Sequence, residues 1–288
     1  MKQIISQISS QLQSAYPEDE ARSLAWWIME ELTGKSRTEL QFGCKDTAFS
    51  SIMQEKSQEI ISRLLHFEPI QYIFGHTLWC GLDLLVTPAT LIPRPETAEL
   101  VERINKPTQT LPEGKALKVL DVGTGSGCIA IALKKAHPSW SVTGIDISPE
   151  AIAIARENAR RNNVEVNFQV ADIFDFNEKN PKYDIVVSNP PYICESEKTS
   201  MRPNVLNFEP STALFVPDSD PLKFYRRIAE LFSLPLQGKG RERGLFFEIN
   251  EVFGEELKQL LDSLGYTDIQ IHKDIYGKDR IIEARMAR

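Results

Sequence analysis

The residues of this chain best suited to chemistry are the consecutive Asn189, Pro190, Pro191 and Tyr192. The asparagine side chain and the backbone carbonyls of such a segment accept N–H hydrogen bonds, and an aromatic ring lies beside them. This combination favours a flat, neutral NH2 group as the ligand. The structural alternative is a proline-rich turn with an exposed tyrosine. A glycine-rich loop upstream, at residues 123–127, makes a binding site the better interpretation.

The segment before Asn189 predicts where residues 189–192 lie in the fold. The run from Asp184 to Val187 is short, rich in β-branched residues and bounded by turn residues, which indicates a strand buried on both faces. Two prolines cannot continue a central strand, and each holds the residue before it extended. The sequence therefore predicts a stiff loop at the carboxyl end of a strand, where open α/β sheets place their active sites.

A second candidate site is the glycine-rich loop, which follows a predicted strand and begins a helix. Its residues are Gly123, Thr124, Gly125, Ser126 and Gly127. Glycines allow a sharp turn and close approach to a ligand, and the helix N-terminus offers free N–H groups. Cys128 stands where a dinucleotide fingerprint requires its last glycine, which makes tight pyrophosphate docking a poor match.

Asp146 ends the next predicted strand, about twenty residues after the loop, where a carboxylate can bind both hydroxyls of a ribose. A nucleoside without a phosphate fits these features, and S-adenosyl-L-methionine is such a ligand. Asp172 and Ile173 follow the third strand, and we expect them at the adenine edge. The alternative for Asp172 is a helix cap or a loop carboxylate.

Methyl transfer from a sulfonium to nitrogen requires mainly that acceptor, methyl carbon and sulfur be aligned. If Asn189 Oδ1 and the Pro190 carbonyl each accept one N–H, the nitrogen is held and its remaining direction faces the methyl group. We expect Tyr192 to stack on the planar acceptor. The acceptor can be a glutamine or asparagine amide, or the exocyclic amine of adenine or cytosine, and the motif alone does not separate these.

Composition limits the class of protein. The chain has 288 residues, a net charge of −7 and four cysteines, Cys44, Cys80, Cys128 and Cys194, without C-x-x-C spacing. This predicts a reduced cytoplasmic protein with no metal site and no disulfide framework. No apolar run reaches the length of a membrane span, and the acidic balance argues against direct nucleic-acid contact.

Hydrophobic spacing predicts the elements that position these residues. Residues 1–70 indicate a small helical domain, residues 71–95 a hairpin linker, and residues 96–288 alternating strands and helices. The last part fits a doubly wound α/β domain of seven strands, in which one of the final two strands runs antiparallel because no helix separates them.

The chain resembles the HemK family of peptide chain release factor glutamine methyltransferases along nearly its whole length. The matching motifs are EPIQY at residues 68–72 with Gly75, LIPRPET at 91–97, DVGTGSG at 121–127, Asp146, SNPPY at 188–192, FEP at 208–210 with ALF at 213–215, and GKDR at 277–280. LIPRPET together with SNPPY is specific to this family, whereas NPPY is shared with enzymes that methylate amino groups of DNA. Relatives often carry Trp at the position of Ile173 and Glu at that of Ala98.

The resemblance implies a seven-stranded, Rossmann-like class I methyltransferase domain and an N-terminal helical domain that helps hold the substrate. It implies that the glutamine in the GGQ motif of class 1 release factors is methylated with S-adenosylmethionine. Residues 123–127, Asp146 and Asn189 would bind the cofactor, and residues 189–192 the glutamine. Alternatives are methylation of a ribosomal protein glutamine, methylation of a nucleic-acid amino group, and a regulator that only binds the cofactor. We expect a monomer.

Overall fold

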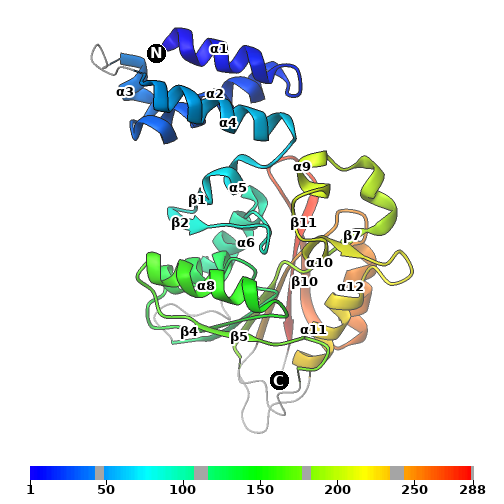
Figure 1. Ribbon diagram of the computed structural model, residues 1–288. Coiled ribbons are helices and arrows are strands. Elements are labelled where there is room, and N and C mark those ends of the chain that lie inside the picture. The colour runs from blue at the N-terminus through cyan, green and yellow to red at the C-terminus, as the bar shows by residue number, and fades with distance from the viewer. Residues whose placement is uncertain (43–48, 107–115, 177–182, 234–242, 287–288) are drawn as a thin grey trace. The chain divides into compact units, whose positions relative to one another are not determined.

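The computed structural model describes residues 1–42, 49–106, 116–176, 183–233 and 243–286 (Figure 1). The chain divides into two compact units. The first comprises Met1–Phe74 and Arg202–Phe208, and the second comprises Gly75–Met201 and Glu209–Arg288. The roles assigned above to the sequence domains stay predictions.

The first unit is helical. Its helices are α1 (Lys2–Leu12), α2 (Glu18–Thr33), α3 (Arg37–Phe42), α4 (Ser51–Leu65), α5 (Ile70–Phe74) and α9 (Pro203–Leu206). The three longest of these helices, α1, α2 and α4, bury Leu12, Ile28 and Leu64 in one hydrophobic cluster. Helix α5 includes residues 71–74, which the sequence assigns to the hairpin linker. A short apolar run does not distinguish helix from strand by periodicity.

A segment distant in sequence completes the helical unit. Arg202 forms an ion pair with Glu20 of α2 at 2.7 Å, and α9 follows directly. The sequence places residues 202–208 in the methyltransferase domain, because nothing in their composition separates them from their neighbours. Their packing assigns them to the helical unit.

The second unit begins with the predicted hairpin. Strand β1 (His76–Trp79) pairs with β2 (Leu82–Leu85) in antiparallel register, with Trp79 opposite Leu82. The two turn residues Cys80 and Gly81 both have positive φ, 50° and 70°. A two-residue turn of this kind matches the twist of the flanking strands.

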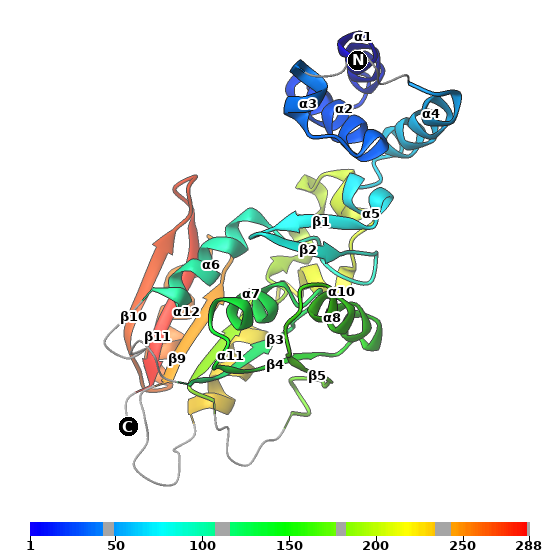
Figure 2. The ribbon, with the colours of Figure 1, turned by 90° about the vertical axis from the view of Figure 1, so that its left-hand side faces the viewer.

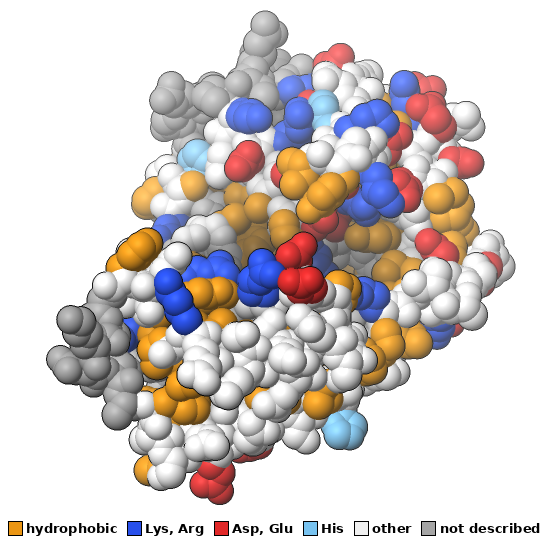
Figure 3. Space-filling model, turned by 90° about the horizontal axis from the view of Figure 1, so that it is seen from above, with side chains coloured by type: hydrophobic (Ala, Val, Ile, Leu, Met, Phe, Trp, Pro, Cys, Tyr) orange, Lys and Arg blue, Asp and Glu red, His pale blue; other side chains and the backbone are white. Residues whose placement is uncertain are grey.

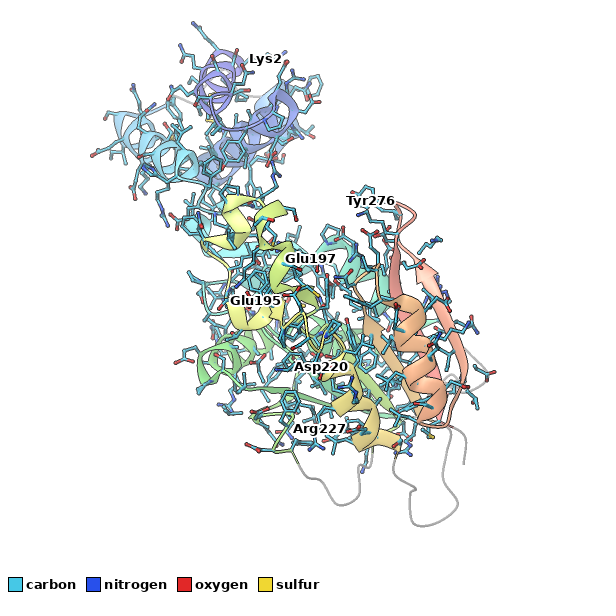
Figure 4. All side chains as sticks on the ribbon, turned by 90° about the vertical axis from the view of Figure 1, so that its right-hand side faces the viewer. Lys2, Glu195, Glu197, Asp220, Arg227 and Tyr276 are labelled. Carbon is cyan, nitrogen blue, oxygen red and sulfur yellow. The ribbon has the colours of Figure 1, made fainter. Side chains whose placement is uncertain are left out.

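The main sheet has seven strands in the order β10-β11-β9-β6-β3-β4-β5. Their bounds are Lys118–Val122 (β3), Ser141–Asp146 (β4), Asn167–Val170 (β5), Ile185–Ser188 (β6), Arg243–Glu248 (β9), Tyr266–Lys273 (β10) and Asp279–Met286 (β11). Strand β11 is antiparallel to both of its neighbours, and the other neighbouring pairs are parallel. This confirms the expected fold class, including the antiparallel last strand. Tyr276 lies near the tip of the β10–β11 hairpin (Figure 4).

Helices cover both faces of this sheet (Figure 2). One core cluster joins the sheet to α6 (Pro95–Asn105), α7 (Cys128–Ala136) and α8 (Pro149–Arg161). The opposite cluster joins it to α11 (Lys223–Ser233) and α12 (Gly254–Ser263). Every residue of β6 is buried, as expected for a strand covered on both faces. Short elements link β6 to α11: β7 (Ile193–Cys194), the 3₁₀ helix η1 (Glu195–Ser200), α10 (Ser211–Leu214) and β8 (Phe215–Val216).

The described residues bear on the expectations for membrane spans, cysteines and surface charge. None of the helices in the described ranges is long and apolar enough to cross a membrane. Cys80, Cys128 and Cys194 are free thiols, and Cys44 lies outside the described residues. On the face shown in Figure 3, basic side chains are interspersed with acidic, polar and hydrophobic ones.

Candidate functional site

A cavity of about 430 Å³ in the second unit brings the two candidate segments together. Its lining includes residues 123–126 of the glycine-rich loop, Asp146, Asp172, Ile173 and residues 188–191. These residues follow the carboxyl ends of β3, β4, β5 and β6, which lie side by side in the parallel part of the sheet. The volume is that of a pocket for a small molecule.

The glycine-rich loop is shaped by backbone geometry that favours glycine. Gly123, Gly125 and Gly127 all have positive φ, and α7 begins directly after Gly127. The N–H of Gly125 donates to Asp146 Oδ2 at 2.8 Å, and the N–H of Ser148 donates to Asp146 Oδ1 at 2.9 Å. The Asp146 carboxylate is therefore fixed beside the loop, and Asp146 ends its strand, β4, as expected. Burial raises its pKa, and the two N–H donors oppose that shift.

Asn158 of α8 holds the loop against the β1–β2 hairpin. Its side chain accepts from the N–H of Leu85 at 2.7 Å and donates to the carbonyls of Leu85 and Ser126 at 3.0 and 2.9 Å. This asparagine is fully buried, and both ends of its amide are hydrogen-bonded. Sequence reasoning did not find it, because an asparagine inside a helix has no local signal for contacts with two distant loops.

The predicted adenine end of the cavity is a tight turn after β5. Asp172 Oδ1 accepts from the N–H of Phe174 at 2.9 Å, and Ile173 is buried. Arg227 of α11 donates to the carbonyls of Ile173, Phe174 and Phe176 at 2.9 to 3.0 Å (Figure 4). The guanidinium thus fixes the backbone that presents Asp172 and Ile173 to the cavity.

Two residues of α11 complete this end and were missed from the sequence. The rings of Phe224 and Phe174 are 5.3 Å apart, and both line the cavity. The Nζ of Lys223 lies 4.9 Å from the centre of the Phe224 ring and 5.2 Å from that of Phe174. Phe174 and Phe224 therefore give this end of the cavity an aromatic surface beside Ile173.

The loop after β6 is held at both ends. Asn189 Nδ2 donates to the hydroxyl of Thr97 in α6 at 3.2 Å. At the other end, the carbonyl of Tyr192 accepts from Asn250 Nδ2 at 3.2 Å. Asn189, Pro190 and Pro191 line the cavity. Their role in holding an acceptor amide stays a prediction.

Tyr192 is placed differently from the other residues of the motif. It is not among the residues that line the cavity, and its hydroxyl donates to the buried Glu248 Oε1 at 3.0 Å. Burial, followed by the nearby charge of Glu248, raises the pKa of the Tyr192 phenol. The hydrogen bond to Glu248 anchors the Tyr192 side chain, and its stacking on an acceptor group stays a prediction.

An ion pair joins two of the sequence motifs beside the cavity, which Arg94 lines. Arg94 of LIPRPET donates to Glu209 Oε1 of FEP at 2.6 Å, and the N–H of Ile92 donates to Glu209 Oε2 at 3.1 Å. The Glu209 side chain is only 1% exposed, so its charge must be paired. The two motifs were recognised from the sequence, but their contact was not.

The donor and acceptor pattern of the cavity fits a nucleoside better than a phosphate. The lining carries the carboxylates of Asp146 and Asp172, which accept from hydroxyl and amine donors and repel anions. The same lining includes Ile173, Phe174 and Phe224, whose side chains offer apolar surface to a flat base. S-adenosylmethionine has this combination of ribose, neutral base and no phosphate.

Asp146→Ala is expected to weaken S-adenosylmethionine binding strongly. Loss of two hydrogen bonds to a charged acceptor, each about 1.5 to 3 kcal/mol, corresponds to a fall in affinity of roughly two to four orders of magnitude. Isothermal titration calorimetry with S-adenosylmethionine and S-adenosylhomocysteine measures this. Glu150→Ala, an exposed carboxylate in the first turn of α8, is the control and should bind normally. If Asp146→Ala binds S-adenosylmethionine with wild-type affinity, Asp146 does not bind the ribose.

Comparison with known proteins adds independent observations. Residues 3–75 match the PrmC N-terminal domain family, and residues 101–206 match the methyltransferase small domain family. The chain is 46% identical over 285 residues, 99% of each chain, to a protein of Bacteroides thetaiotaomicron named release factor glutamine methyltransferase. A protein of the same name from Flavobacterium psychrophilum is 41% identical over 98% of each chain.

Among solved structures, a methyltransferase from Pyrococcus furiosus superposes with a TM-score of 0.50. The match covers 79% of this chain and 98% of that one, at 18% identity. At this identity the similarity shows the fold alone.

Proposed function

Since the chain belongs to the release factor glutamine methyltransferase family, we propose that it methylates the GGQ glutamine of class 1 peptide chain release factors. The family resemblance inferred from the motifs is thereby confirmed. The chain is an S-adenosylmethionine-dependent protein-(glutamine-N5) methyltransferase.

One observation supports the proposal most directly: a single cavity holds the ribose-type carboxylate of Asp146 and the amide acceptor of Asn189. When bound, S-adenosylmethionine supplies an activated methyl group on a positively charged sulfur. The protein must therefore hold the methyl acceptor beside it and exclude other nucleophiles.

The loop after β6 performs this task by hydrogen bonding. Asn189 Oδ1 and the Pro190 carbonyl accept the two N–H groups of the substrate amide, which fixes the amide plane and draws electron density onto its nitrogen. The two prolines stiffen the loop, so little conformational entropy is lost when the substrate binds. The face of the nitrogen left free is directed into the cavity that contains Asp146.

The substrate nitrogen gives up one proton as its new N–C bond forms. Among the described residues, the lining of the cavity includes no histidine and no glutamate. The methylated amide is strongly acidic, so that water or a carbonyl oxygen suffices as the proton acceptor. The chemistry therefore depends on alignment rather than on a base with a tuned pKa.

The proposed function also implies which partner the protein binds and in which compartment it acts. A release factor is a protein, and the interspersed charges of the face in Figure 3 and the net charge of −7 fit a protein partner better than a phosphate backbone. We infer that the enzyme acts as a monomer in the cytoplasm, where class 1 release factors work, and that the helical unit contributes to holding the release factor.

Incubation of the purified protein with S-adenosylmethionine and a class 1 release factor tests the function. Peptide mass spectrometry should find one added methyl group, located on the GGQ glutamine. A release factor in which that glutamine is replaced by glutamate should remain unmodified. Parallel reactions with ribosomal proteins and with DNA should show no modification. Methylation of either of these, with none on the release factor, would contradict the proposal.

A further inference from the structure

A chain of hydrogen bonds leads from the loop after β6 into the protein interior. Asn189 Nδ2 donates to Thr97 Oγ1 at 3.2 Å, and the Thr97 hydroxyl donates to Glu248 Oε2 at 2.6 Å. The other oxygen of Glu248 accepts from Tyr192 at 3.0 Å. Thr97 lies in the first turn of α6, and Glu248 is the last residue of β9.

The direction of each bond follows from the chemistry of the groups. An ionised carboxylate only accepts hydrogen bonds, and a threonine hydroxyl has one hydrogen to donate. With that hydrogen directed to Glu248, the oxygen of Thr97 can only accept. The Asn189 amide must then turn its NH2 group toward Thr97, and its Oδ1 is left on the opposite side of the amide.

We propose that Thr97 and Glu248 are positioning residues that fix the orientation of the Asn189 amide, so that an acceptor oxygen and not a donor NH2 faces the substrate. The inference rests on the proposed function. It explains how an asparagine, which carries a donor and an acceptor of nearly equal size, can present only the acceptor to a glutamine amide.

Both side-chain oxygens of Glu248 accept a hydroxyl hydrogen bond, which is the arrangement of an ionised carboxylate. The residue is 1% exposed, and burial raises the pKa of its carboxyl. The hydroxyls of Thr97 and Tyr192 and the positive charge of Arg280 oppose that shift. A protonated Glu248 could donate to Thr97, whose hydroxyl would then donate to Asn189 Oδ1. With the hydrogen bonds reversed in this way, the NH2 group of Asn189 would face the N–H groups of the substrate amide.

Substitution of Thr97 separates this role from packing. Thr97→Val keeps the volume but removes the hydroxyl, and Thr97→Ser keeps the hydroxyl. We expect Thr97→Val to lower kcat for the release factor by roughly 10- to 100-fold, the cost of a misplaced reactant. Thr97→Ser should retain most of the activity, and both variants should bind S-adenosylmethionine within about threefold of wild type. Thr143→Val, which removes a buried hydroxyl from β4, controls for the loss of a polar group in the core.

Target selectivity provides a readout that a purely structural role would not change. Wild-type protein, with Asn189 Oδ1 facing the substrate, should bind the release factor with its GGQ glutamine much more tightly than the same protein with glutamate there. In Thr97→Val the amide is free to turn its NH2 group toward a carboxylate. The glutamine-to-glutamate affinity ratio should therefore fall by about tenfold or more, since unpaired buried acceptors discriminate strongly.

Glu248→Gln is a second test of the inference, because it introduces an NH2 donor into the series of hydrogen bonds while keeping the shape of the side chain. It should shift the same ratio in the same direction. The inference is wrong if Thr97→Val and Glu248→Gln both keep the wild-type kcat and the wild-type glutamine-to-glutamate affinity ratio. It is also wrong if kcat falls as much in Thr97→Ser as in Thr97→Val. Failure of the wild-type protein to methylate any release factor would instead contradict the proposed function, so the two failures are distinguishable.

Discussion

Asn189→Ala is expected to lower kcat for release factor methylation by about 10²- to 10³-fold, the usual effect of removing one preorganised group that binds the reacting atoms. The variant loses the side-chain oxygen that fixes the substrate amide, while the glycine-rich loop and Asp146 remain. Affinity for S-adenosylmethionine should change by no more than about tenfold, because Asp146 and Asp172, the residues expected to contact the ribose and the base, are unchanged.

Single-turnover kinetics and calorimetry measure these two quantities separately. Asn167→Ala, at an exposed position in β5, is the matched control and should behave as wild type. Near-normal turnover in Asn189→Ala would show that the backbone carbonyls alone align the amide. Loss of cofactor binding with normal chemistry at saturation would assign Asn189 to the cofactor instead.

Gly127→Ala is expected to destabilise the protein and to weaken cofactor binding together. Gly127 has a φ of +80°, and a Cβ there would lie 2.9 Å from Phe168 and 3.1 Å from both Ala155 and Ile131. A left-handed backbone costs an L-residue about 1 to 2 kcal/mol, and overpacking adds about 1 to 3 kcal/mol. The free energy of unfolding should therefore fall by roughly 2 to 5 kcal/mol.

Gly265→Ala separates the two contributions. Its φ of +86° is equally unfavourable, but a Cβ at this position meets nothing within 4 Å. In Gly265→Ala the free energy of unfolding should fall only by the cost of the left-handed backbone, about 1 to 2 kcal/mol. This variant should bind S-adenosylmethionine normally. Denaturant melts of the ligand-free proteins and titration calorimetry provide both values. Equal losses of stability in the two variants would show that Phe168 and its neighbours move aside without cost.

Local patterns were sufficient to predict the two loops that line the cavity. Prolines that end a buried strand, and glycines between a strand and a helix, restrict the backbone wherever they occur, so the loop after β6 and the loop after β3 could be placed from the sequence. The order of elements then predicted a doubly wound sheet, whose parallel strands bring both loops to one edge. Asn189 and Asp146 line the same cavity, as this order of elements predicts.

Contacts between distant residues could not be predicted in this way. Thr97 is 92 residues from Asn189 and 151 from Glu248, and Arg94 is 115 from Glu209. Threonine in a first helical turn and glutamate at a strand end have ordinary local explanations, and periodicity contains no information on which partners they meet. The same limit explains why Tyr192 was expected at the surface of the cavity, although a buried carboxylate anchors its hydroxyl.

The central claim is that a stiff loop of acceptor oxygens holds a glutamine amide with its nitrogen facing an activated methyl group. A crystal structure with S-adenosylhomocysteine and the release factor tests it most directly. We predict that the amide nitrogen of the GGQ glutamine lies within hydrogen-bonding distance of both Asn189 Oδ1 and the Pro190 carbonyl oxygen, on the side of the cavity that faces the cofactor sulfur. An Asn189 side chain turned away from the bound amide, or directing its NH2 group at the nitrogen, would contradict the account.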